Sequence, residues 1–261
     1  MMDIKAVFLD VDKTMTSEKD ASLVASCLQA CRQLQANGIA VVIATGRQAH
    51  CIPCVEDGQV KPDYIMASNG AAIYDGQKNL LWCESLDRQV FEDITDYCRQ
   101  NHIDIFWKFI DGMYAYVGES ELAQDVKRRL KHFTIGTHPD PKALPNAGGL
   151  VCSDLEKLAE FHRLFDRRIM CVNGGFYIHD LTNLDTDKGT GLQRLAELLG
   201  ITAKQCAAFG DSENDVPMLK AAGLGVAMGN AMEVTKQSAD YVSTNASEDG
   251  VYNALKKYGI L

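Results

Sequence analysis

The chain has 261 residues, of which 46% are apolar and 23% charged, and its net charge is −9. This composition is ordinary for a globular protein with a core, and the length allows one large domain or two smaller ones. The negative charge argues against a nucleic acid or a membrane surface as partner, since both favour a basic face.

The first third of the chain alternates apolar runs with a helical pattern. Short apolar runs that end in polar residues predict buried strands over 4–9, 39–44 and 64–67. Between the first two, apolar residues recur at helical spacing from 23 to 34, and Asn37-Gly38 is expected to end that helix. Such near-continuous apolar strands are typical of a parallel sheet covered on both faces.

From about residue 80 the pattern changes. Helices are predicted over 87–101, 121–132 and 155–165, and they alternate with strand pairs whose connections include Asp111-Gly112 and Asn173-Gly174-Gly175. This differs from the simple strand–helix order before it. We therefore predict a separate α+β domain over residues 80–182, inserted into a core domain formed by residues 1–79 and 183–261.

The strand–helix order resumes in the last third. A helix is predicted over 190–199, and strands over 206–209, 225–227 and 241–242 lead to a terminal helix over 247–257. The fold class expected is therefore α/β, with a doubly wound, mostly parallel sheet in the core and an inserted α+β domain.

Polar side chains gather where the predicted strands end or the helices begin. Ligands of doubly wound sheets bind outside the carboxyl ends of the strands, so these side chains are expected to converge along one edge. They are Asp10, Asp12, Thr45, Lys188, Asp211, Asn214 and Asp215. Two aspartates as close as Asp10 and Asp12 repel each other unless a cation lies between them, and oxygen ligands favour Mg²⁺.

This set of side chains suits phosphoryl transfer. A phosphate monoester requires a nucleophile, a cation for the phosphate oxygens, hydrogen-bond donors and an acid for the leaving oxygen. The Thr45 hydroxyl and the Lys188 ammonium can donate to phosphate, and Asp10 and Asp211 can bracket Mg²⁺. Asp12 can protonate the departing alkoxide and later deprotonate the attacking water.

Four segments resemble the motifs of the haloacid dehalogenase superfamily, in their order and over the whole chain. They are Asp10-Val11-Asp12-Lys13-Thr14, Thr45-Gly46-Arg47, Asp187-Lys188-Gly189 and Gly210-Asp211-Ser212-Glu213-Asn214-Asp215. The insertion between the second and third motifs is similar to that of the Cof-type, type-IIB branch of sugar-phosphate phosphatases. Ser68-Asn69-Gly70-Ala71 also resembles a segment of that branch.

The resemblance implies a role for each matching residue. Asp10 is implied to be the nucleophile and a Mg²⁺ ligand, and Asp12 the general acid and base with its backbone carbonyl on the metal. Asp211 completes the protein ligands, and Asp215 orients Lys188 and metal-bound water. Binding of phosphate or substrate is implied for Thr45, Gly46, Arg47, Asn69, Lys188 and Asn214.

Lys13 departs from the family pattern, which usually has glycine at this position. Glycine permits a tight turn with positive φ, so a lysine would either change the turn or hold a strained one. It could also place a second cation near the phosphate.

The expected function is that of a Mg²⁺-dependent phosphatase, a hydrolase that acts on a small phosphomonoester, plausibly a sugar phosphate, through an aspartyl-phosphate. Asp12 points this way because, as the resemblance implies, a dehalogenase or a P-type ATPase does not carry this acid. One alternative is a phosphomannomutase-like phosphotransferase, which would need an acceptor site in the insertion. Another is a phospho-acceptor module without turnover, against which the length, the insertion and the second acidic cluster argue.

Partners and location follow from simpler features. No run of about 18 apolar residues occurs, and the N-terminus lacks the pattern of a secretory signal. Nine irregularly spaced cysteines read as reduced thiols, and Cys51 and Cys54 are expected to be structural rather than redox-active. We expect a cytoplasmic protein whose partner is a small molecule; its oligomeric state cannot be read from the sequence.

The insertion is expected to close over the strand ends and to supply substrate contacts. Candidates are Trp107, Lys108, Tyr114, Tyr116 and His179, although core packing is the favoured interpretation for one of the aromatic residues.

Overall fold

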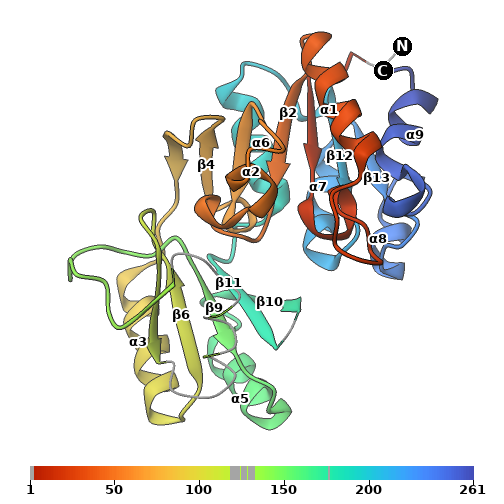
Figure 1. Cartoon of the computed structure of the whole chain (residues 1–261). Helices are drawn as coiled ribbons and strands as arrows, with labels where there is room; N and C mark the ends of the chain where they lie inside the picture. Colours follow the sequence, from red (N-terminus) through yellow and green to blue (C-terminus); the bar gives the residue numbers. More distant parts are fainter. Residues whose placement is uncertain (1–2, 118–123, 125–127, 129–132, 176) are drawn as a thin grey trace. The chain divides into compact units, whose positions relative to one another are not determined.

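The computed structural model describes residues 3–117, 124, 128, 133–175 and 177–261. The chain forms two compact units (Figure 1). Unit 1 consists of Met1–Thr45, Pro53–Trp82 and Asp187–Leu261, and unit 2 consists of Gly46–Ile52 and Cys83–Thr186.

Unit 1 is built on an eight-stranded sheet in the order β14-β13-β12-β1-β2-β3-β4-β5. Its strands are β1 (Ala6–Leu9), β2 (Ala40–Ala44), β3 (Tyr64–Ala67), β4 (Ala72–Asp75), β5 (Leu80–Cys83), β12 (Cys206–Gly210), β13 (Leu224–Ala227) and β14 (Tyr241–Val242). The pairs from β14 to β3 are parallel, and β4 runs antiparallel to β3. The central strands are fully buried, as expected of a sheet covered on both faces.

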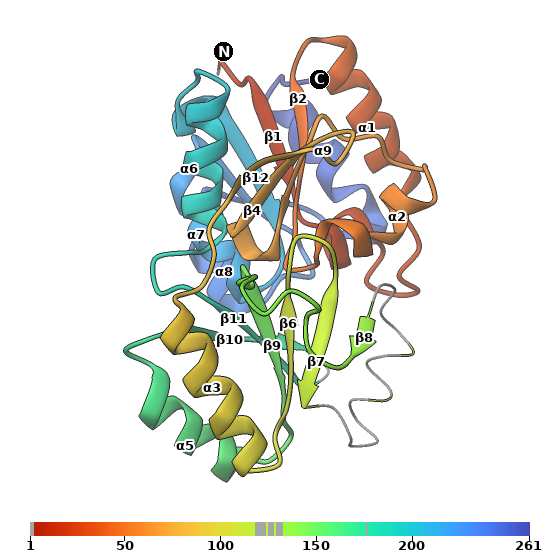
Figure 2. The same cartoon turned by 90° about the vertical axis from the view of Figure 1, so that its left-hand side faces the viewer.

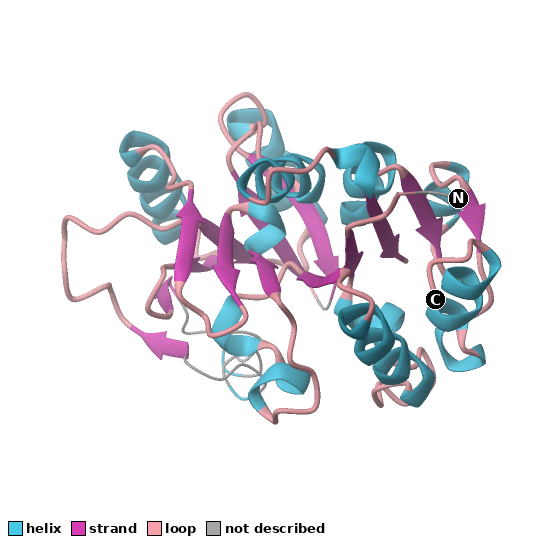
Figure 3. Ribbon diagram, turned by 90° about the horizontal axis from the view of Figure 1, so that it is seen from above, coloured by secondary structure: helices cyan, strands magenta, loops and turns pink. Residues whose placement is uncertain are grey.

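Helices cover both faces of this sheet (Figures 2 and 3). They are α1 (Ala25–Ala36), α2 (Pro53–Glu56), α6 (Lys188–Leu198), α7 (Val216–Ala221), α8 (Glu233–Gln237) and α9 (Gly250–Lys257). α1 packs against α9, α6 packs against α7, and Figure 2 shows these two pairs on opposite sides of the sheet. The predicted doubly wound α/β fold is confirmed.

The periodicity of α1 explains how such a helix docks. Its buried residues Cys27, Ala30, Cys31 and Leu34 recur at the spacing of one helical face, while the other face is polar. The helix ends at Ala36, where Asn37 is the C-cap, as the Asn-Gly pair predicts.

Unit 2 contains a six-stranded sheet in the order β10-β11-β9-β6-β7-β8, and its described residues include two α-helices. The strands are β6 (Asp104–Lys108), β7 (Met113–Val117), β8 (Phe133–Ile135), β9 (Ala147–Val151), β10 (Met170–Gly175) and β11 (Ile178–Thr182), and the helices are α3 (Arg88–Gln100) and α5 (Leu155–Phe165). All strand pairs are antiparallel except β7 and β8. The unit therefore has the α+β character that the sequence predicts.

The segment Gly46–Ile52, which the sequence analysis assigned to the core, packs with unit 2. Lys108 Nζ donates to the Gly46 carbonyl at 2.8 Å, and Gln48 Nε2 donates to the Phe109 carbonyl at 2.9 Å. These side chains attach the segment to the end of β6. The C-terminal boundary of the insertion also differs from the predicted one, because unit 2 extends to Thr186 and the prediction ended at residue 182.

Most candidate contacts in the insertion have structural partners. Trp107 is fully buried and donates from its indole N–H to Thr95 Oγ1 at 2.9 Å, so it belongs to the core. Lys108 is buried and pairs with Asp180 at 2.7 Å. Burial lowers the pKa of His179, which is half-buried. The predicted helix over 121–132 lies outside the described residues except at 124 and 128.

All nine cysteines are free thiols, as the irregular spacing predicts. Within the part of the chain that the structure describes, no helix combines the length and the apolar character needed to cross a membrane.

Candidate active site

Two aspartates that lie 201 positions apart in the chain follow neighbouring strands. β1 pairs with β12 in parallel, with Leu9 opposite Phe209, and the Asp10 N–H continues the ladder by donating to the Phe209 carbonyl at 3.1 Å. Asp10 and Asp211 therefore leave the sheet at the same edge, as the topology predicts. Asp10 is 8% exposed and Asp211 is 3% exposed.

The chain after Asp10 makes an irregular turn, η1 (Val11–Met15), with π-type hydrogen bonding. The Met15 and Thr16 N–H groups donate to the carbonyls of Asp10 and Val11 at 3.3 and 3.0 Å. Asp12, which is exposed, has non-helical dihedrals within this turn. Such wide turns are frequent at functional sites.

Lys13, which stands where the family usually has glycine, either changes the turn or holds it under strain, and its backbone dihedrals distinguish the two. Its φ is 63° and its ψ is 11°, so the lysine adopts the left-handed conformation that glycine would adopt freely. The turn is therefore kept, and the lysine holds it under strain. The Lys13 N–H donates to Thr16 Oγ1 at 3.0 Å, and Asn230 Nδ2 donates to the Lys13 carbonyl at 2.8 Å.

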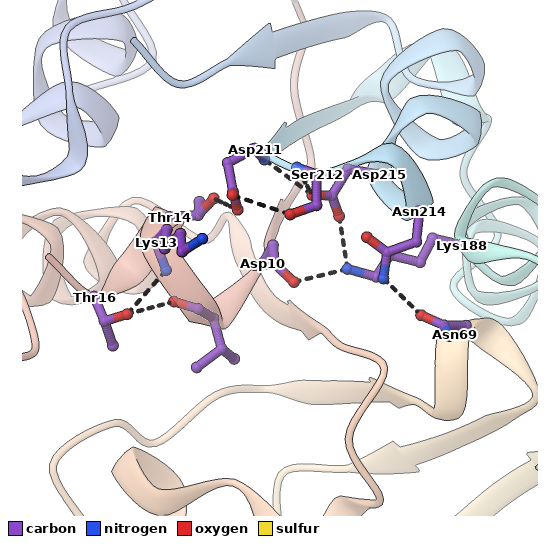
Figure 4. Close-up of polar contacts among 11 residues, drawn as sticks. Asp10, Lys13, Thr14, Thr16, Asn69, Lys188, Asp211, Ser212, Asn214 and Asp215 are labelled. Carbon is purple, nitrogen blue, oxygen red and sulfur yellow. Dashed lines mark hydrogen bonds and ion pairs between the residues drawn. The ribbon is translucent and has the colours of Figure 1, made fainter. Parts of the chain in front are cut away.

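Lys188 links two of the acidic residues (Figure 4). It is the first residue of α6, and Asp187 caps this helix by accepting from the N–H groups of Gly189 and Thr190. The Lys188 ammonium, which is 0% exposed, donates to Asp10 Oδ1 at 2.7 Å and to Asp215 Oδ1 at 2.6 Å. A buried ammonium between two carboxylates is charge-compensated and holds both in place.

Asp215 also organises the loop that carries Asp211. Its Oδ2 accepts from the N–H groups of Asp211 at 2.9 Å and Ser212 at 3.0 Å. The Asp211 carboxylate accepts in turn from Ser212 Oγ at 3.0 Å and from Thr14 Oγ1 at 3.3 Å. Figure 4 shows these groups converging between the loops after β1 and β12.

Three carboxylates could hold a metal ion. Asp10, Asp211 and Asp215 each offer an oxygen atom, and these atoms lie within 4.8 Å of one another. All three residues are buried, and oxygen-only donors are the ligands that Mg²⁺ prefers. Asp10 and Asp211 are therefore close enough to share one ion. The Asp215 carboxylate already accepts hydrogen bonds from Lys188 and two backbone N–H groups. It is therefore suited to hold the metal ligands in place rather than to bind the ion itself.

The pKa shifts of the buried side chains are those expected of a cation-binding site. Burial raises the pKa of Asp10 well above its usual value, and Asp215 and Asp211 add to this rise while Lys188 opposes it. Burial, followed by the charge of Asp215, raises the pKa of Asp211 to about 6. For Lys188, burial lowers the pKa, but the attraction of Asp10 and Asp215 outweighs it and raises the pKa above its usual value. A divalent cation would relieve the repulsion between these carboxylates.

A second group of site residues surrounds Asn69. Its N–H donates to the Thr45 carbonyl at 3.0 Å, and its Oδ1 accepts from Asn214 Nδ2 at 2.9 Å. Asn69 thus joins the end of β2 to the loop after β12. Ser68 and Asn69 have φ values of 53° and 54°, and two adjacent left-handed residues other than glycine are a mark of strain at functional sites.

Gly70 brings this turn, η3 (Ser68–Gly70), against the start of α6. Its φ is 97°, and a Cβ at this position would lie 2.2 Å from the Asp187 carbonyl oxygen. Only glycine tolerates both the dihedral and the close approach. Gly210 likewise allows a close approach, since a Cβ at this position would lie 2.4 Å from the Asp215 side chain.

The structure brings together most of the predicted site residues in unit 1. Hydrogen bonds join Asp10, Lys188, Asp211 and Asp215 in one network, and Thr45, Asn69 and Asn214 in a second, where Asn69 meets Thr45 through the backbone. Asp12 lies in the turn next to the first network. Gly46 and Arg47 belong to unit 2, and their part in the site stays a prediction.

Sequence reasoning assigned no role to three residues that support the site. Thr14 and Ser212 lie inside the recognised motifs and hydrogen-bond to Asp211. Asn230 holds the turn at Lys13, and it follows β13 in the same way that the predicted residues follow their strands. The strand-end criterion could therefore have found Asn230, but its partner could not be known.

Comparison with known proteins agrees with this geometry. Residues 7–255 match the family model of the haloacid dehalogenase-like hydrolases. A 5-amino-6-(5-phospho-D-ribitylamino)uracil phosphatase from Bacillus subtilis is 28% identical over 258 residues, which cover 98% of this chain and 96% of its own. A phosphoglycolate phosphatase from Methanopyrus kandleri is 31% identical over 256 residues, which cover 96% of this chain and 95% of its own.

Solved structures show the same architecture. A phosphatase of this superfamily from Bacteroides thetaiotaomicron has a TM-score of 0.86 and 26% identity, and the match covers 99% of this chain and 96% of that chain. A subclass IIB sugar phosphatase has a TM-score of 0.87 at 23% identity and covers 98% of this chain and 100% of its own, which shows the shared fold.

Proposed function

The chain belongs to the haloacid dehalogenase-like hydrolase family, and from this premise we propose that it is a Mg²⁺-dependent phosphatase. Its substrate is a small phosphomonoester, in our proposal a sugar phosphate, and the reaction passes through an aspartyl-phosphate. The observation that carries the proposal is the network in which Lys188 joins Asp10 to Asp215, beside Asp211. It combines a nucleophile, a cation site and a phosphate-binding ammonium at one sheet edge.

The donor set fits Mg²⁺. Asp10, Asp211 and the backbone carbonyl of Asp12 would hold the ion, and Asp215 would stand behind them through Lys188 and the loop N–H groups. When bound, Mg²⁺ supplies positive charge to the phosphate oxygens and to the crowded carboxylates.

In the first step a carboxylate oxygen of Asp10 attacks phosphorus. A new P–O bond to Asp10 forms while the P–O bond to the substrate alcohol breaks, and Asp12 donates a proton to the departing oxygen. Lys188 orients Asp10 through its 2.7 Å contact, opposes the rise that burial causes in the pKa of Asp10, and can donate to the transferred phosphoryl group.

In the second step water attacks the phosphorus of the aspartyl-phosphate. Asp12, now a carboxylate, takes the proton of this water, the P–O bond to Asp10 breaks, and inorganic phosphate leaves. The exposed position of Asp12 supports this exchange, because its carboxyl group is accessible to solvent water.

The remaining predicted residues act on the substrate. Thr45 and Lys188 bind the phosphoryl group, and Asn214 and Asn69 hold each other at the side of the site where Thr45 lies. Arg47 and Asn69 are proposed to lie near the leaving group, and Gly46 is proposed to bind phosphate or substrate. Unit 2 is proposed to act as the cap that sets specificity and excludes bulk water.

The exact substrate is not decided by similarity. Two relatives of comparable identity are named for unlike substrates, a phosphoribitylaminouracil and phosphoglycolate. They share a phosphomonoester on a small polar alcohol, which is the substrate class proposed here. We also propose a cytoplasmic location, because the expected partners are small phosphorylated metabolites.

The two alternatives make different products. A phosphomannomutase-like phosphotransferase would return the phosphoryl group to a sugar, and a phospho-acceptor module would keep it on Asp10. No contact in the described residues favours either, and the relatives reported above are named phosphatases.

The test is a screen for phosphate release from sugar, nucleotide and cofactor monophosphates, with Mg²⁺ and with a chelator. Release that requires Mg²⁺ and shows a preference among sugar phosphates is the expected result. Absence of release from every substrate, or release that the chelator leaves unchanged, would contradict the proposal. A long-lived aspartyl-phosphate without turnover would instead favour the acceptor module.

A further inference from the structure

Lys13 adds a positive charge to a site that is otherwise acidic. Asp10, Asp12, Asp211 and Asp215 provide four carboxylates, while Lys188 already compensates two of them from a buried position. Lys13 is exposed, and within the described part of the chain its ammonium makes no ion pair. Its charge is therefore available to a ligand that enters the site from solvent.

The backbone at Lys13 is held in place. Its N–H donates to Thr16 Oγ1 at 3.0 Å, and its carbonyl accepts from Asn230 Nδ2 at 2.8 Å, so the turn has polar contacts on both sides. The left-handed φ of 63° strains the backbone of a lysine, whereas a glycine adopts it freely. A strained residue that is anchored in this way is a reason to look for a function of its side chain.

Lys13 lies next to the residues that would hold the metal ion. It belongs to the turn η1, which directly follows Asp10 and contains Asp12. Figure 4 shows Lys13 beside Thr14, whose hydroxyl donates to Asp211 Oδ1 at 3.3 Å. The Lys13 ammonium would therefore repel an incoming metal cation, which is attracted by the same carboxylates. A phosphate oxyanion would instead be attracted by both the ammonium and the metal cation.

We propose that Lys13 is a second phosphate-binding cation of this site, which strengthens the binding of a phosphate dianion and weakens the binding of Mg²⁺ alone. The proposal rests on the proposed function, since it assumes that a phosphate group binds beside Asp10. It assigns to Lys13 an effect of opposite sign on the two ligands, which a merely structural lysine would not have.

The variant that isolates the charge is Lys13→Asn. Asparagine tolerates the left-handed conformation better than most residues, so the turn is kept while the ammonium is removed. Lys13→Arg keeps a positive charge at the same place. Lys78→Asn is the control for the loss of one charge at another left-handed lysine of unit 1, because Lys78 has a φ of 66° and lies in the turn between β4 and β5, where it is ion-paired with Glu56.

Two affinities are measured by calorimetry: that of Mg²⁺ alone, and that of inorganic phosphate at saturating Mg²⁺. For Lys13→Asn we expect Mg²⁺ to bind about five-fold tighter and phosphate about five-fold weaker, as for a charge near the protein surface. Lys13→Arg and Lys78→Asn are expected to match the wild type. Both effects should shrink as NaCl rises from about 0.05 M to about 0.5 M.

The outcomes separate this inference from the proposed function. If the wild type binds Mg²⁺ and phosphate but Lys13→Asn changes neither affinity, or changes both in the same direction, Lys13 has no such role and the proposed function stands. Equal changes in Lys78→Asn would assign the effect to net charge and overturn the inference. A wild type that binds no Mg²⁺ would overturn both.

Discussion

Lys188 Nζ lies 2.7 Å from Asp10 Oδ1, although the two residues are 178 positions apart in the chain. The same ammonium lies 2.6 Å from Asp215 Oδ1, and neither Lys188 nor Asp215 is exposed to solvent. The proposed nucleophile is therefore held by a buried ion pair before any substrate arrives. Such preorganisation means that the carboxylate needs little reorientation when the phosphoryl group binds.

Asp10→Asn is expected to abolish Mg²⁺-dependent phosphate release, by at least about a thousand-fold, because an amide oxygen is a poor nucleophile. The fold should persist, since the amide oxygen can still accept from Lys188. Phosphate release and far-UV circular dichroism measure the two effects. Asp57→Asn is the matched control, because Asp57 is exposed in unit 1, away from the site network. Activity close to the wild type in Asp10→Asn would remove Asp10 from the nucleophile role.

Asp12→Asn is expected to slow both steps, because one group serves first as acid and then as base. General acid–base catalysis contributes typically about 10²–10⁴-fold, and the loss should be of that order with an alkyl phosphate. With an activated leaving group such as p-nitrophenol, the first step no longer needs the acid. The variant should then accumulate aspartyl-phosphate, which acid quenching after rapid mixing detects. Equal losses for both substrates without this intermediate would argue against the dual role.

Lys188→Met is expected to lower the free energy of unfolding by about 3–5 kcal/mol, because Asp10 and Asp215 would be left buried without their counter-ion. Urea unfolding of the metal-free protein measures the change. In Lys188→Met with Asp215→Asn the second substitution should restore part of the loss, so the two effects are not additive. Lys220→Met, on the exposed surface of α7, is the control and should be nearly neutral. Strict additivity of the pair would contradict the coupling.

The pH dependence of stability follows from Asp211. Its pKa is raised to about 6 in the fold, first by burial and then by Asp215, whereas an unfolded aspartate titrates near 3.9. Between these values the folded state binds more protons than the unfolded state, so stability falls as the pH rises through this window. The metal-free protein should be more stable at about pH 5 than at about pH 7, with Asp211 contributing on the order of 1 kcal/mol.

This dependence is checked by urea unfolding in the presence of a chelator. Asp211→Asn should lack the contribution, and saturating Mg²⁺ should remove it from the wild type, because the bound ion replaces the proton. An identical pH profile for the wild type and Asp211→Asn would show that Asp211 does not titrate in this range.

Lys13→Gly is expected to be more stable than Lys13→Ala by about 1 kcal/mol, because only glycine adopts a φ of 63° without strain. This order is the reverse of that at helical or extended positions, where glycine is the less stable residue. The comparison removes the charge in both variants, so it reports on the backbone alone. Equal stability of the two variants in urea unfolding would show that the turn relaxes instead of remaining strained.

The amino-acid pattern was sufficient for the fold of each part of the chain. Apolar runs that end in polar residues predicted the six parallel strands of unit 1, from Ala6–Leu9 to Tyr241–Val242, and the change near residue 80 predicted the α+β insertion. These features depend on short-range periodicity, which is fully present in the sequence. The motif residues could be named for the same reason, because each follows a predicted strand or opens a helix.

Tertiary structure decided what the motif residues do to one another. The bridge of Lys188 between Asp10 and Asp215, and the support of Asp211 by Thr14 and Ser212, join residues up to 197 positions apart. The sequence left open whether Lys13 changes the turn or holds it under strain, and it did not reveal the contact of Lys13 with Asn230. Periodicity states which face of an element is buried, but distance, burial and charge act through space. The pKa shifts and contacts that set the chemistry therefore exist only once the strand ends have met.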